Sequence, residues 1–460
     1  MKTGFKKICY DSEETFSLSL TNGTQFASEQ RLRIIPGKRV VARGRWEDKT
    51  VVAKIFFSKN AKKHAESDRR GIAALHKKKI PAPLLLCSDT INLAGQDIVI
   101  LLFDYIPHAK QLDASLLTTD EGIALLKKII TEIATQHVLG ILQKDLHFSN
   151  FLIQENDKKT NILTVDGAQI QSCDSILDKE TSMHNIALLL SQIGAGESDL
   201  QEKLFRFYAT LRGWLLQATD LVQFHACIDE VNKNRWENFS QKINRDSTAF
   251  VTLRQGNYHG MYQRDKQKPD FLAFLKDPDA IFQSASSHLL KAGNSATVIK
   301  IALDGKYFVI KRYNIKNIWH YLRRCLRPTR AACCWRIAQK LKLFHVATAD
   351  PVAFIEKKSF GLRGLSYYVT DYIEGENAKD YFHEKQSADN VADMLKRIKQ
   401  LFFKIKSLNI SHGDLKITNI LIDRDNKPVM IDLDGAIEHD SLSTLHSTWK
   451  KELKRFDRNF

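Results

Sequence analysis

The 460-residue sequence has no apolar run long enough to cross a membrane. A membrane-spanning helix needs about 20 consecutive apolar residues, and every apolar stretch here is interrupted well before that length. The chain also turns acidic at residues 11–14 before any apolar run develops, so we predict no secretory signal peptide. These absences argue against an integral membrane protein and predict a cytoplasmic location, free or bound at a surface.

Cysteine is scarce and scattered. Of the seven cysteines, no two are spaced as C-x-x-C, and the odd count argues against a disulfide framework. We therefore expect reduced and mostly buried cysteines, with Cys333 and Cys334 packed on a helix.

Acidic residues are absent from residues 305–349, which contain eleven Lys or Arg. The chain has a net charge of +16, of which residues 261–460 contribute +12. A charge run is usually a solvated face, but these cations are interleaved with Trp319, Leu326 and Trp335. That pattern is typical of surfaces that bind anionic membranes. We predict that this segment binds an anionic membrane or glycolipid, and we expect no nucleic-acid partner because no motif for one is present.

One short motif occurs twice. The first half contains QKDLHFSNFLI and the second half HGDLKITNILI. Both copies place an Asn five residues after an Asp and just before an apolar run suited to a buried strand. The paired residues are Asp145 with Asn150 and Asp414 with Asn419.

Each motif is followed by another apolar stretch that ends in an Asp. This residue is Asp166 in the first half and Asp432 in the second. Asp434 is a second candidate, because Asp434-Gly-Ala matches Asp166-Gly-Ala letter for letter. The separation from Asp414 and the apolar Val-Met-Ile sequence directly before Asp432 favour Asp432.

Two carboxylates and an Asn at these spacings suit phosphoryl transfer. One carboxylate accepts the hydrogen bond of the attacking hydroxyl, and the Asn oxygen and second carboxylate hold magnesium, which prefers oxygen ligands. A single motif could equally be a turn before a strand, since Asp and Asn are common turn residues. The second copy, with its own downstream Asp, favours the catalytic interpretation.

Each half also contains a strand that ends in a lysine suited to binding nucleotide phosphates. Lys54 follows Val-Val-Ala, and the helix expected over 61–78 offers Glu66 as its ion-pair partner. Lys311 follows Tyr-Phe-Val-Ile, but the helix expected near 329–343 contains no acid. Either Lys311 pairs with another acid in space, or the second half binds nucleotide poorly. We therefore expect the first half to be the better catalyst.

Glycine is too sparse for a G-x-G-x-x-G phosphate loop in either half. Gly44 stands alone in the first half, and Gly293 marks a turn in the second.

The doubled motif and the lysine strands resemble the protein-kinase-like superfamily, whose signature is H-R-D-L-x-x-x-N followed by D-F-G. The resemblance implies an α+β protein with tandem kinase-like folds, each a small β-rich N-lobe and a helical C-lobe. We predict a first domain over 1–250, a linker over 251–283 and a second domain over 284–460. The second C-lobe is minimal, because only 28 residues follow Asp432.

The residues before each catalytic Asp narrow the resemblance. His412-Gly-Asp414 departs from H-R-D toward the H-G-D of sugar kinases, and Asp145 follows Gln-Lys. The second half resembles the lipopolysaccharide core kinases, the Kdo and heptose kinases of Gram-negative bacteria, and the first half looks like another member. The resemblance implies ATP- and Mg²⁺-dependent phosphorylation of an inner-core sugar at the cytoplasmic face of the inner membrane.

The resemblance also implies a role for each residue of the two sites. The catalytic bases are Asp145 and Asp414, the metal ligands are Asn150, Asp166, Asn419 and Asp432, and the residues that bind or support the nucleotide are Lys54, Glu66, Asn150, Lys311 and Asn419. Two alternatives stay open. The missing acid and sparse glycines also fit a non-catalytic binding module, and the motifs also fit a protein or small-molecule kinase of another kind.

Overall fold

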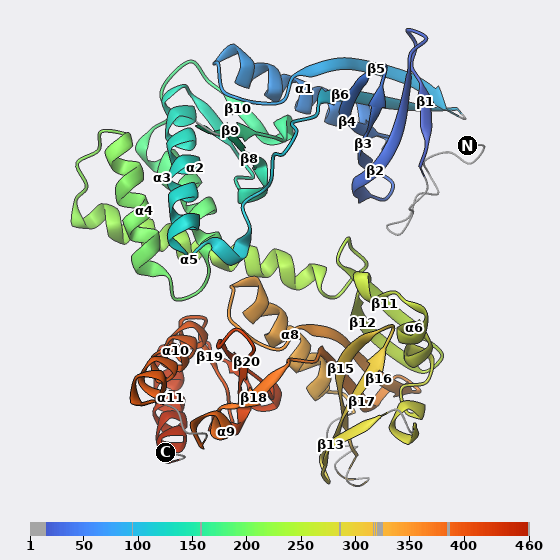
Figure 1. Ribbon diagram of the computed structural model, residues 1–460, viewed down its shortest axis with the longest axis vertical. Helices are drawn as coiled ribbons and strands as arrows, with labels where there is room; N and C mark the ends of the chain where they lie inside the picture. The colour runs from blue at the N-terminus through green and yellow to red at the C-terminus, as the bar shows by residue number, and fades with distance from the viewer. Residues whose placement is uncertain are drawn as a thin grey trace. The chain divides into compact units, whose positions relative to one another are not determined.

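The computed structural model describes residues 15–458 except 94, 157–158, 285–286, 316, 318, 320–324 and 384–386. The chain divides into two compact units (Figure 1). The first unit comprises Met1–Ile193 and Asp199–Asn232, and the second comprises Gly194–Ser198 and Lys233–Phe460. Each unit combines an antiparallel sheet with helices, so the α+β class predicted from the sequence is confirmed.

The first unit begins with a six-stranded sheet in the order β1-β2-β3-β4-β6-β5. Side chains of β4 alternate between its two faces, so Val51 and Ala53 enter one apolar core while Phe56 enters another beneath helix α1. Lys54 lies on the same side as Phe56, facing α1. The elements are β1 (Ser17–Ser19), β2 (Gln25–Ile35), β3 (Arg39–Trp46), β4 (Lys49–Phe56), α1 (Ala61–Lys77), β5 (Leu85–Leu93) and β6 (Gln96–Asp104).

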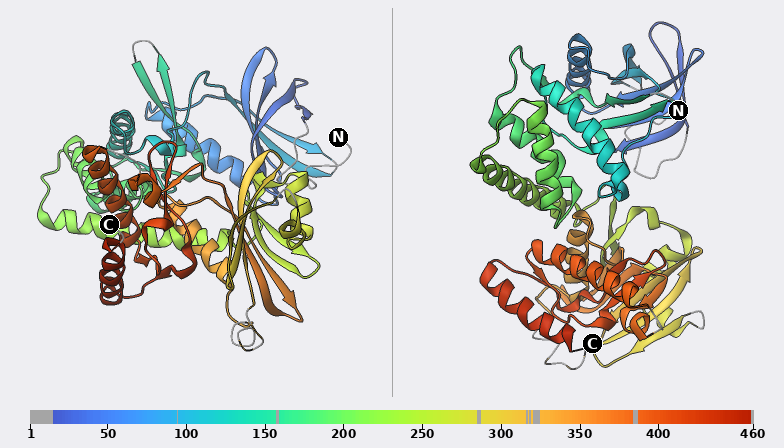
Figure 2. Two further views of the ribbon diagram at one scale, coloured as in Figure 1. Left: turned by 60° about the horizontal axis from the view of Figure 1, so that its bottom comes forward. Right: turned by 60° about the vertical axis from the view of Figure 1, so that its left-hand side comes forward.

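The rest of the first unit is mainly helical, with short strand pairs that hold the first motif. In both views of Figure 2 the blue strands lie apart from the green helices of this unit. Strand β7 pairs with β10, and β8 with β9. The elements are η2 (Ala114–Leu116), α2 (Asp120–Val138), β7 (Ile141–Gln143), η3 (Phe148–Asn150), β8 (Phe151–Asn156), β9 (Lys159–Thr164), η4 (Gly167–Gln169), β10 (Ile170–Ser172), α3 (Lys179–Leu190), η5 (Ser191–Ile193) and α4 (Ser198–Leu211). Helix α5 (Ala218–Lys242) begins in this unit, and its residues from Lys233 onward belong to the second.

The second unit repeats the strand order of the first. Its sheet runs β11-β12-β16-β17-β15-β14-β13, and the last five strands correspond to β5-β6-β4-β3-β2. Helix α8 follows β15 as α1 follows β4. The elements are β13 (His288–Ala292), β14 (Ala296–Leu303), β15 (Lys306–Tyr313), α8 (Arg330–Leu343), β16 (Pro351–Ser359) and β17 (Leu362–Asp371).

The prediction of a linker over 251–283 is wrong, because these residues fold into the second unit. Strands β11 and β12 form a hairpin whose turn is Gly256-Asn257, and β12 then pairs with β16. Gly256 has a φ of 54°, the left-handed conformation that two-residue hairpin turns require. Pro269 begins helix α6, where the missing N–H of a proline is harmless. The elements are β11 (Phe250–Gln255), β12 (Tyr258–Gln263), η6 (Arg264–Lys266), α6 (Pro269–Lys276) and η7 (Ala280–Gln283).

The second motif lies in the same kind of strand arrangement as the first. Strand β19 pairs with β22, and β20 with β21, and helix α11 follows. The elements are β18 (Gly375–Asn377), α9 (Ala378–His383), α10 (Ala388–Ser407), β19 (Ile410–Ser411), η8 (Ile417–Asn419), β20 (Ile420–Asp423), β21 (Pro428–Met430), η9 (Leu433–Gly435), β22 (Ile437–Glu438) and α11 (Leu442–Asp457).

The C-terminal part of the basic segment 305–349 packs into the second unit. This part contains α8, in which Trp335 is 1% exposed and belongs to the main core of the second unit. Both cysteines of this helix lie on it as predicted, with Cys334 buried and Cys333 exposed. Arg336 and Lys340 of α8 form ion pairs with Glu438. Their acidic partner lies outside the segment, so the composition of the segment alone does not indicate these ion pairs.

No helix within the described residues combines the length and apolar character that crossing a bilayer requires.

Candidate functional site

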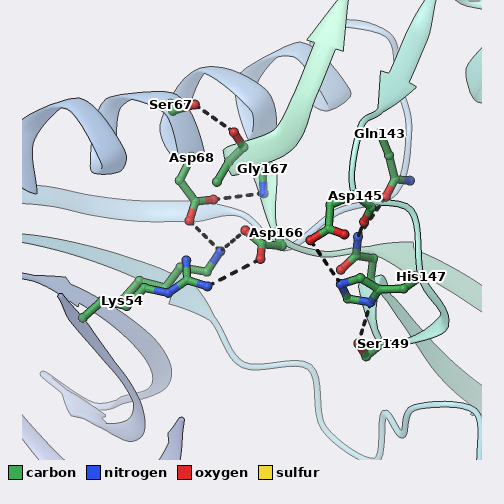
Figure 3. Close-up of polar contacts among 12 residues, drawn as sticks. Lys54, Ser67, Asp68, Gln143, Asp145, His147, Ser149, Asp166 and Gly167 are labelled. Carbon is green, nitrogen blue, oxygen red and sulfur yellow. Dashed lines mark hydrogen bonds and ion pairs between the residues drawn. The ribbon is translucent and has the colours of Figure 1, made fainter. Parts of the chain in front are cut away.

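Lys54 is the centre of the polar cluster in the first unit (Figure 3). Its Nζ lies 2.7 Å from Oδ2 of Asp68 on α1 and 3.6 Å from Oδ1 of Asp166. The side chain of Asp68 is fully buried, and its other oxygen accepts a hydrogen bond from the backbone N–H of Gly167 at 3.0 Å. A Cβ on Gly71 would lie 1.9 Å from the carbonyl oxygen of Gly167, so a glycine is needed for α1 to approach this loop. Strand, helix and loop thus meet at one buried carboxylate.

The prediction that Glu66 is the partner of Lys54 is wrong. Glu66 forms ion pairs with Arg69 and Arg70 and its side chain is 41% exposed. Two residues along a helix are about 200° apart around its axis, so Glu66 and Asp68 face opposite directions. Asp68 shares the i, i+4, i+7 spacing with buried Ile72 and Leu75, a periodicity that could have identified it from the sequence.

The first motif brings its polar residues to the same cavity. The amide nitrogen of Asn150 donates to the backbone carbonyl of Asp145 at 2.7 Å, and Asn150 is buried. Asp166 has a φ of 71° and begins the 3₁₀ turn η4. Burial alone would raise the pKa of Asp166, but the nearby Lys54 and Arg39 hold it below its ordinary value. Lys54, Asn150 and Asp166 line a cavity of about 580 Å³. Asp145 is exposed beside His147.

Lys311 is the corresponding lysine of the second unit, and the loop after the second motif supplies both of its partners. Its Nζ lies 2.6 Å from Oδ1 of Asp432 and 2.7 Å from Oδ2 of Asp434. Burial would lower the pKa of Lys311, but the carboxylates of Asp434 and Asp432 outweigh it and raise that pKa. The hydroxyl of Tyr313 donates to Asp434 at 2.5 Å. Of the two possibilities left open by the sequence, Lys311 therefore pairs with acids that α8 does not carry.

The backbone distinguishes the two aspartates of this loop. Asp432 has a φ of 60° and begins the 3₁₀ turn η9, as Asp166 begins η4. Asp432 is therefore the counterpart of Asp166, in agreement with the choice made from the spacing. Asp434 occupies the position of Ala168, and its carboxylate takes the part that Asp68 plays in the first unit.

The surroundings of Asp414 in the second motif favour the ionised form of its side chain. It lies 2.8 Å from Nζ of Lys416 and 3.2 Å from Nη1 of Arg455. Burial would raise the pKa of Asp414, but these cations and a hydrogen bond from Asn419 bring it below its ordinary value. The side chain of Asn419 also donates to the backbone carbonyl of Asp414 at 2.9 Å. The ionised Asp414 is therefore available to accept a hydrogen bond from a substrate hydroxyl.

Sequence reasoning missed two residues of α11 that hold this loop. The carboxylate of buried Glu452 accepts hydrogen bonds from the backbone N–H groups of His412 and Gly413. Arg455 of the same helix pairs with Asp414. Both lie about forty residues from the motif in the sequence, so its spacing could not indicate them.

The second cavity has a volume of about 460 Å³ and a composition suited to a nucleotide. Its apolar walls provide a slot for a flat base, and its polar end contains Lys311, Lys416, Asn419 and Asp432. The residues forming these walls include Val298, Val309, Leu421 and Ile431.

The polar end of this cavity fits a magnesium ion that is bound together with phosphates. No cluster of three or more His, Cys, Asp or Glu suited to a metal occurs in the described parts of the chain. Magnesium in phosphotransferases is held by one or two carboxylates and by oxygens of the substrate. The carboxylate of Asp432 fits this demand, with Asn419, whose amide nitrogen is engaged by the Asp414 carbonyl, supplying its oxygen.

Two comparisons relate part of this chain to known proteins. Residues 293–460 match the family described as "Lipopolysaccharide kinase (Kdo/WaaP) family". Over 187 residues, the chain is 27% identical to 3-deoxy-D-manno-octulosonic acid kinase of Vibrio parahaemolyticus serotype O3:K6 (strain RIMD 2210633). That alignment covers 39% of this chain and 75% of the relative. The family match includes Lys311, Asp414 and Asp432.

Replacing Asp68 tests the assignment of the Lys54 partner. We expect Asp68→Asn to destabilise the first unit by about 2 kcal/mol, because it weakens a buried, charge-assisted contact. Glu66→Gln, two residues earlier, should change stability by less than about 0.5 kcal/mol because Glu66 is exposed. Hydrogen exchange of α1 peptides across a urea series measures both changes, and equal effects would contradict the assignment.

Proposed function

We propose that the second unit phosphorylates a Kdo or heptose sugar of the lipopolysaccharide inner core with ATP, from the premise that residues 293–460 match the lipopolysaccharide kinase (Kdo/WaaP) family. The observation that carries the proposal is the meeting of Lys311, Asn419 and Asp432 at one cavity, with ionised Asp414 on the same loop. The first unit repeats the element order and places Lys54, Asn150 and Asp166 in the same way, which supports two kinase-like units in tandem.

The roles of the residues follow from their charges. Asp414 accepts the proton of the attacking sugar hydroxyl, and Lys311 and Lys416 neutralise phosphate oxygens of ATP. Asn419 and Asp432 would hold magnesium, which neutralises charge on the phosphates. A bond forms between the sugar oxygen and the terminal phosphorus, while the bond from that phosphorus to the bridging oxygen of ADP breaks.

We assign this activity to the second unit rather than the first. The expectation that the first half is the better catalyst rested on Glu66, which faces away from Lys54. The family match ends before the first unit is reached. Lys416, two residues after Asp414, lies in its cavity, whereas His147 stands at that position in the first unit, where burial lowers its pKa. The second unit therefore has a permanent cation two residues after its candidate base, where the first unit has a histidine.

Substitution of the two candidate bases tests the proposal. We expect Asp414→Asn to lower transfer of labelled phosphate from ATP to a Kdo-containing lipid A acceptor by about 10³-fold, because general-base catalysis contributes about that much. Asp145→Asn, the matched change in the first motif, should retain most of the activity. The reverse pattern would place catalysis in the first unit, and labelled protein without labelled lipid would contradict the proposed acceptor.

Asp434 is expected to position Lys311 rather than contact the substrate. We predict that Asp434→Asn lowers kcat/KM for ATP about tenfold, mainly through KM, because Lys311 loses one of its two carboxylate partners. Asp440→Asn, an exposed aspartate of the following turn, is the matched control and should have no effect. An unchanged KM for ATP in the Asp434 variant would show that Lys311 does not depend on this contact.

We propose that the protein meets its lipid-anchored acceptor at an anionic membrane surface. The part of the basic segment before α8 supports this proposal, because Trp319 and Leu326 are 75% and 77% exposed among lysines and arginines. Exposed Trp and Leu side chains enter the lipid headgroup region, and the cations are attracted to anionic lipids. The partner surface is thus narrower than the whole of 305–349.

Vesicle co-sedimentation tests the membrane proposal. We expect the chain to bind vesicles that contain anionic phosphatidylglycerol more strongly than purely zwitterionic vesicles, by about tenfold at low salt. The double variant Trp319→Ser, Leu326→Ser should lose most of this binding, whereas Leu215→Ser, at a still more exposed residue of the first unit, should not. Equal binding by both variants would contradict the proposal.

A further inference from the structure

The cavity of the first unit has the features of a nucleotide site, although the family match does not reach it. Val41, Val52 and Leu152 form apolar walls there. They stand at the positions that Val298, Val309 and Leu421 occupy in the second cavity. Both cavities are also lined by the same three-residue sequence, Asp-Tyr-Ile, at the C-terminal ends of the corresponding strands β6 and β17, at 104–106 and at 371–373.

The two cavities differ at the aspartate that is expected to bind metal. In the first unit, Nη2 of Arg39 lies 3.8 Å from Oδ2 of Asp166, and Nζ of Lys54 lies 3.6 Å from its other oxygen. Arg33 lines the same cavity. Both oxygens of Asp166 therefore already face a cation of the chain.

Strand register shows what stands in place of Arg39 in the second unit. Val41 pairs with Arg33 across the β2–β3 hairpin, and Val298 pairs with Lys291 across the β13–β14 hairpin. Two residues before these valines stand Arg39 and Ala296. The second unit thus has a methyl group where the first has a guanidinium, and this difference leaves Asp432 without an arginine at that side.

The guanidinium of Arg39 is held only loosely by Asp166, because their 3.8 Å contact is longer than a hydrogen bond. Its Nε is buried and has no hydrogen-bond partner among the described residues. A guanidinium presents several donors in a planar fork that matches phosphate oxygens, and it keeps its charge at every physiological pH. Magnesium would have to compete with a cation at each oxygen of Asp166, whereas the ion pair of Asp432 with Lys311 involves one oxygen, Oδ1.

We propose that the first unit binds a nucleoside triphosphate without a divalent metal, with Arg39 and Lys54 neutralising the phosphates in the place of magnesium. The metal site predicted at Asn150 and Asp166 would then be replaced by a cation of the chain itself. The tandem arrangement would combine one metal-dependent catalytic site with one metal-independent nucleotide site. This inference does not depend on the acceptor that the second unit phosphorylates.

The test uses the full chain with the second site disabled by Lys311→Met and Asp432→Asn. Calorimetric titration with ATP should give a Kd that changes less than about threefold between excess EDTA and excess magnesium. Adding Arg39→Gln should weaken binding in EDTA by about tenfold or more, because a charged phosphate contact is lost. Arg45→Gln, on the same strand but exposed, is the matched control and should bind like its parent.

A second variant of Arg39 tests whether this residue takes the place of magnesium. Arg39→Ala introduces the residue that the second unit has at this position, so it should turn ATP binding from metal-independent to magnesium-dependent. The inference is overturned if the parent chain does not bind ATP, if its binding requires magnesium, or if Arg39→Gln binds as tightly as Arg45→Gln. Circular dichroism and thermal melting establish that each variant is folded. None of these measurements requires a lipid acceptor, so they remain separate from the assay of sugar phosphorylation.

Discussion

The contact between a strand lysine and the carboxylates around it is the interaction on which both units depend. Lys54 and Lys311 project from the sheet toward a helix and a loop, where water is largely excluded. A buried ammonium is costly unless it is paired and hydrogen-bonded. Each lysine therefore fixes where the loop that follows the motif can lie relative to the sheet. The cavity, its apolar walls and its polar end are all consequences of that placement.

The two units meet this constraint with acids from different elements. In the first unit the acid comes from helix α1, and the close approach of Gly71 to Gly167 brings Asp68 within reach of both lysine and loop. In the second unit the acid comes from the loop itself, where Asp434 stands in the position of Ala168. Helix α8 is then free to contribute apolar residues such as Trp335 and Cys334 to the core. Both units thus neutralise the charge of the strand lysine, but with acids at different positions of the chain.

The errors of sequence interpretation have physical causes. Glu66 is an acid on the expected helix, but helical periodicity turns it away from the strand lysine and toward Arg69 and Arg70. The linker was placed at glycines and prolines that in fact form a hairpin turn and the first residue of a helix. The basic segment itself contains no acid, and the partner of Arg336 and Lys340 in its C-terminal part is Glu438, which is distant in the sequence. In each case the sequence shows the type of residue, but it does not show where the side chain points or which residue it contacts.

The sequence by itself determined the doubled motif, the lysine strands, the α+β class and the lipopolysaccharide kinase (Kdo/WaaP) family that residues 293–460 match. These features are local, because fixed spacings of Asp, Asn and apolar residues dictate a loop followed by a strand wherever they occur. Only the tertiary structure decided which acids neutralise each lysine, that Glu452 and Arg455 hold the second motif, and that Arg39 occupies one side of Asp166. Those contacts join residues that are roughly 15 to 130 positions apart, and charge pairing over such separations is set by how strands and helices pack.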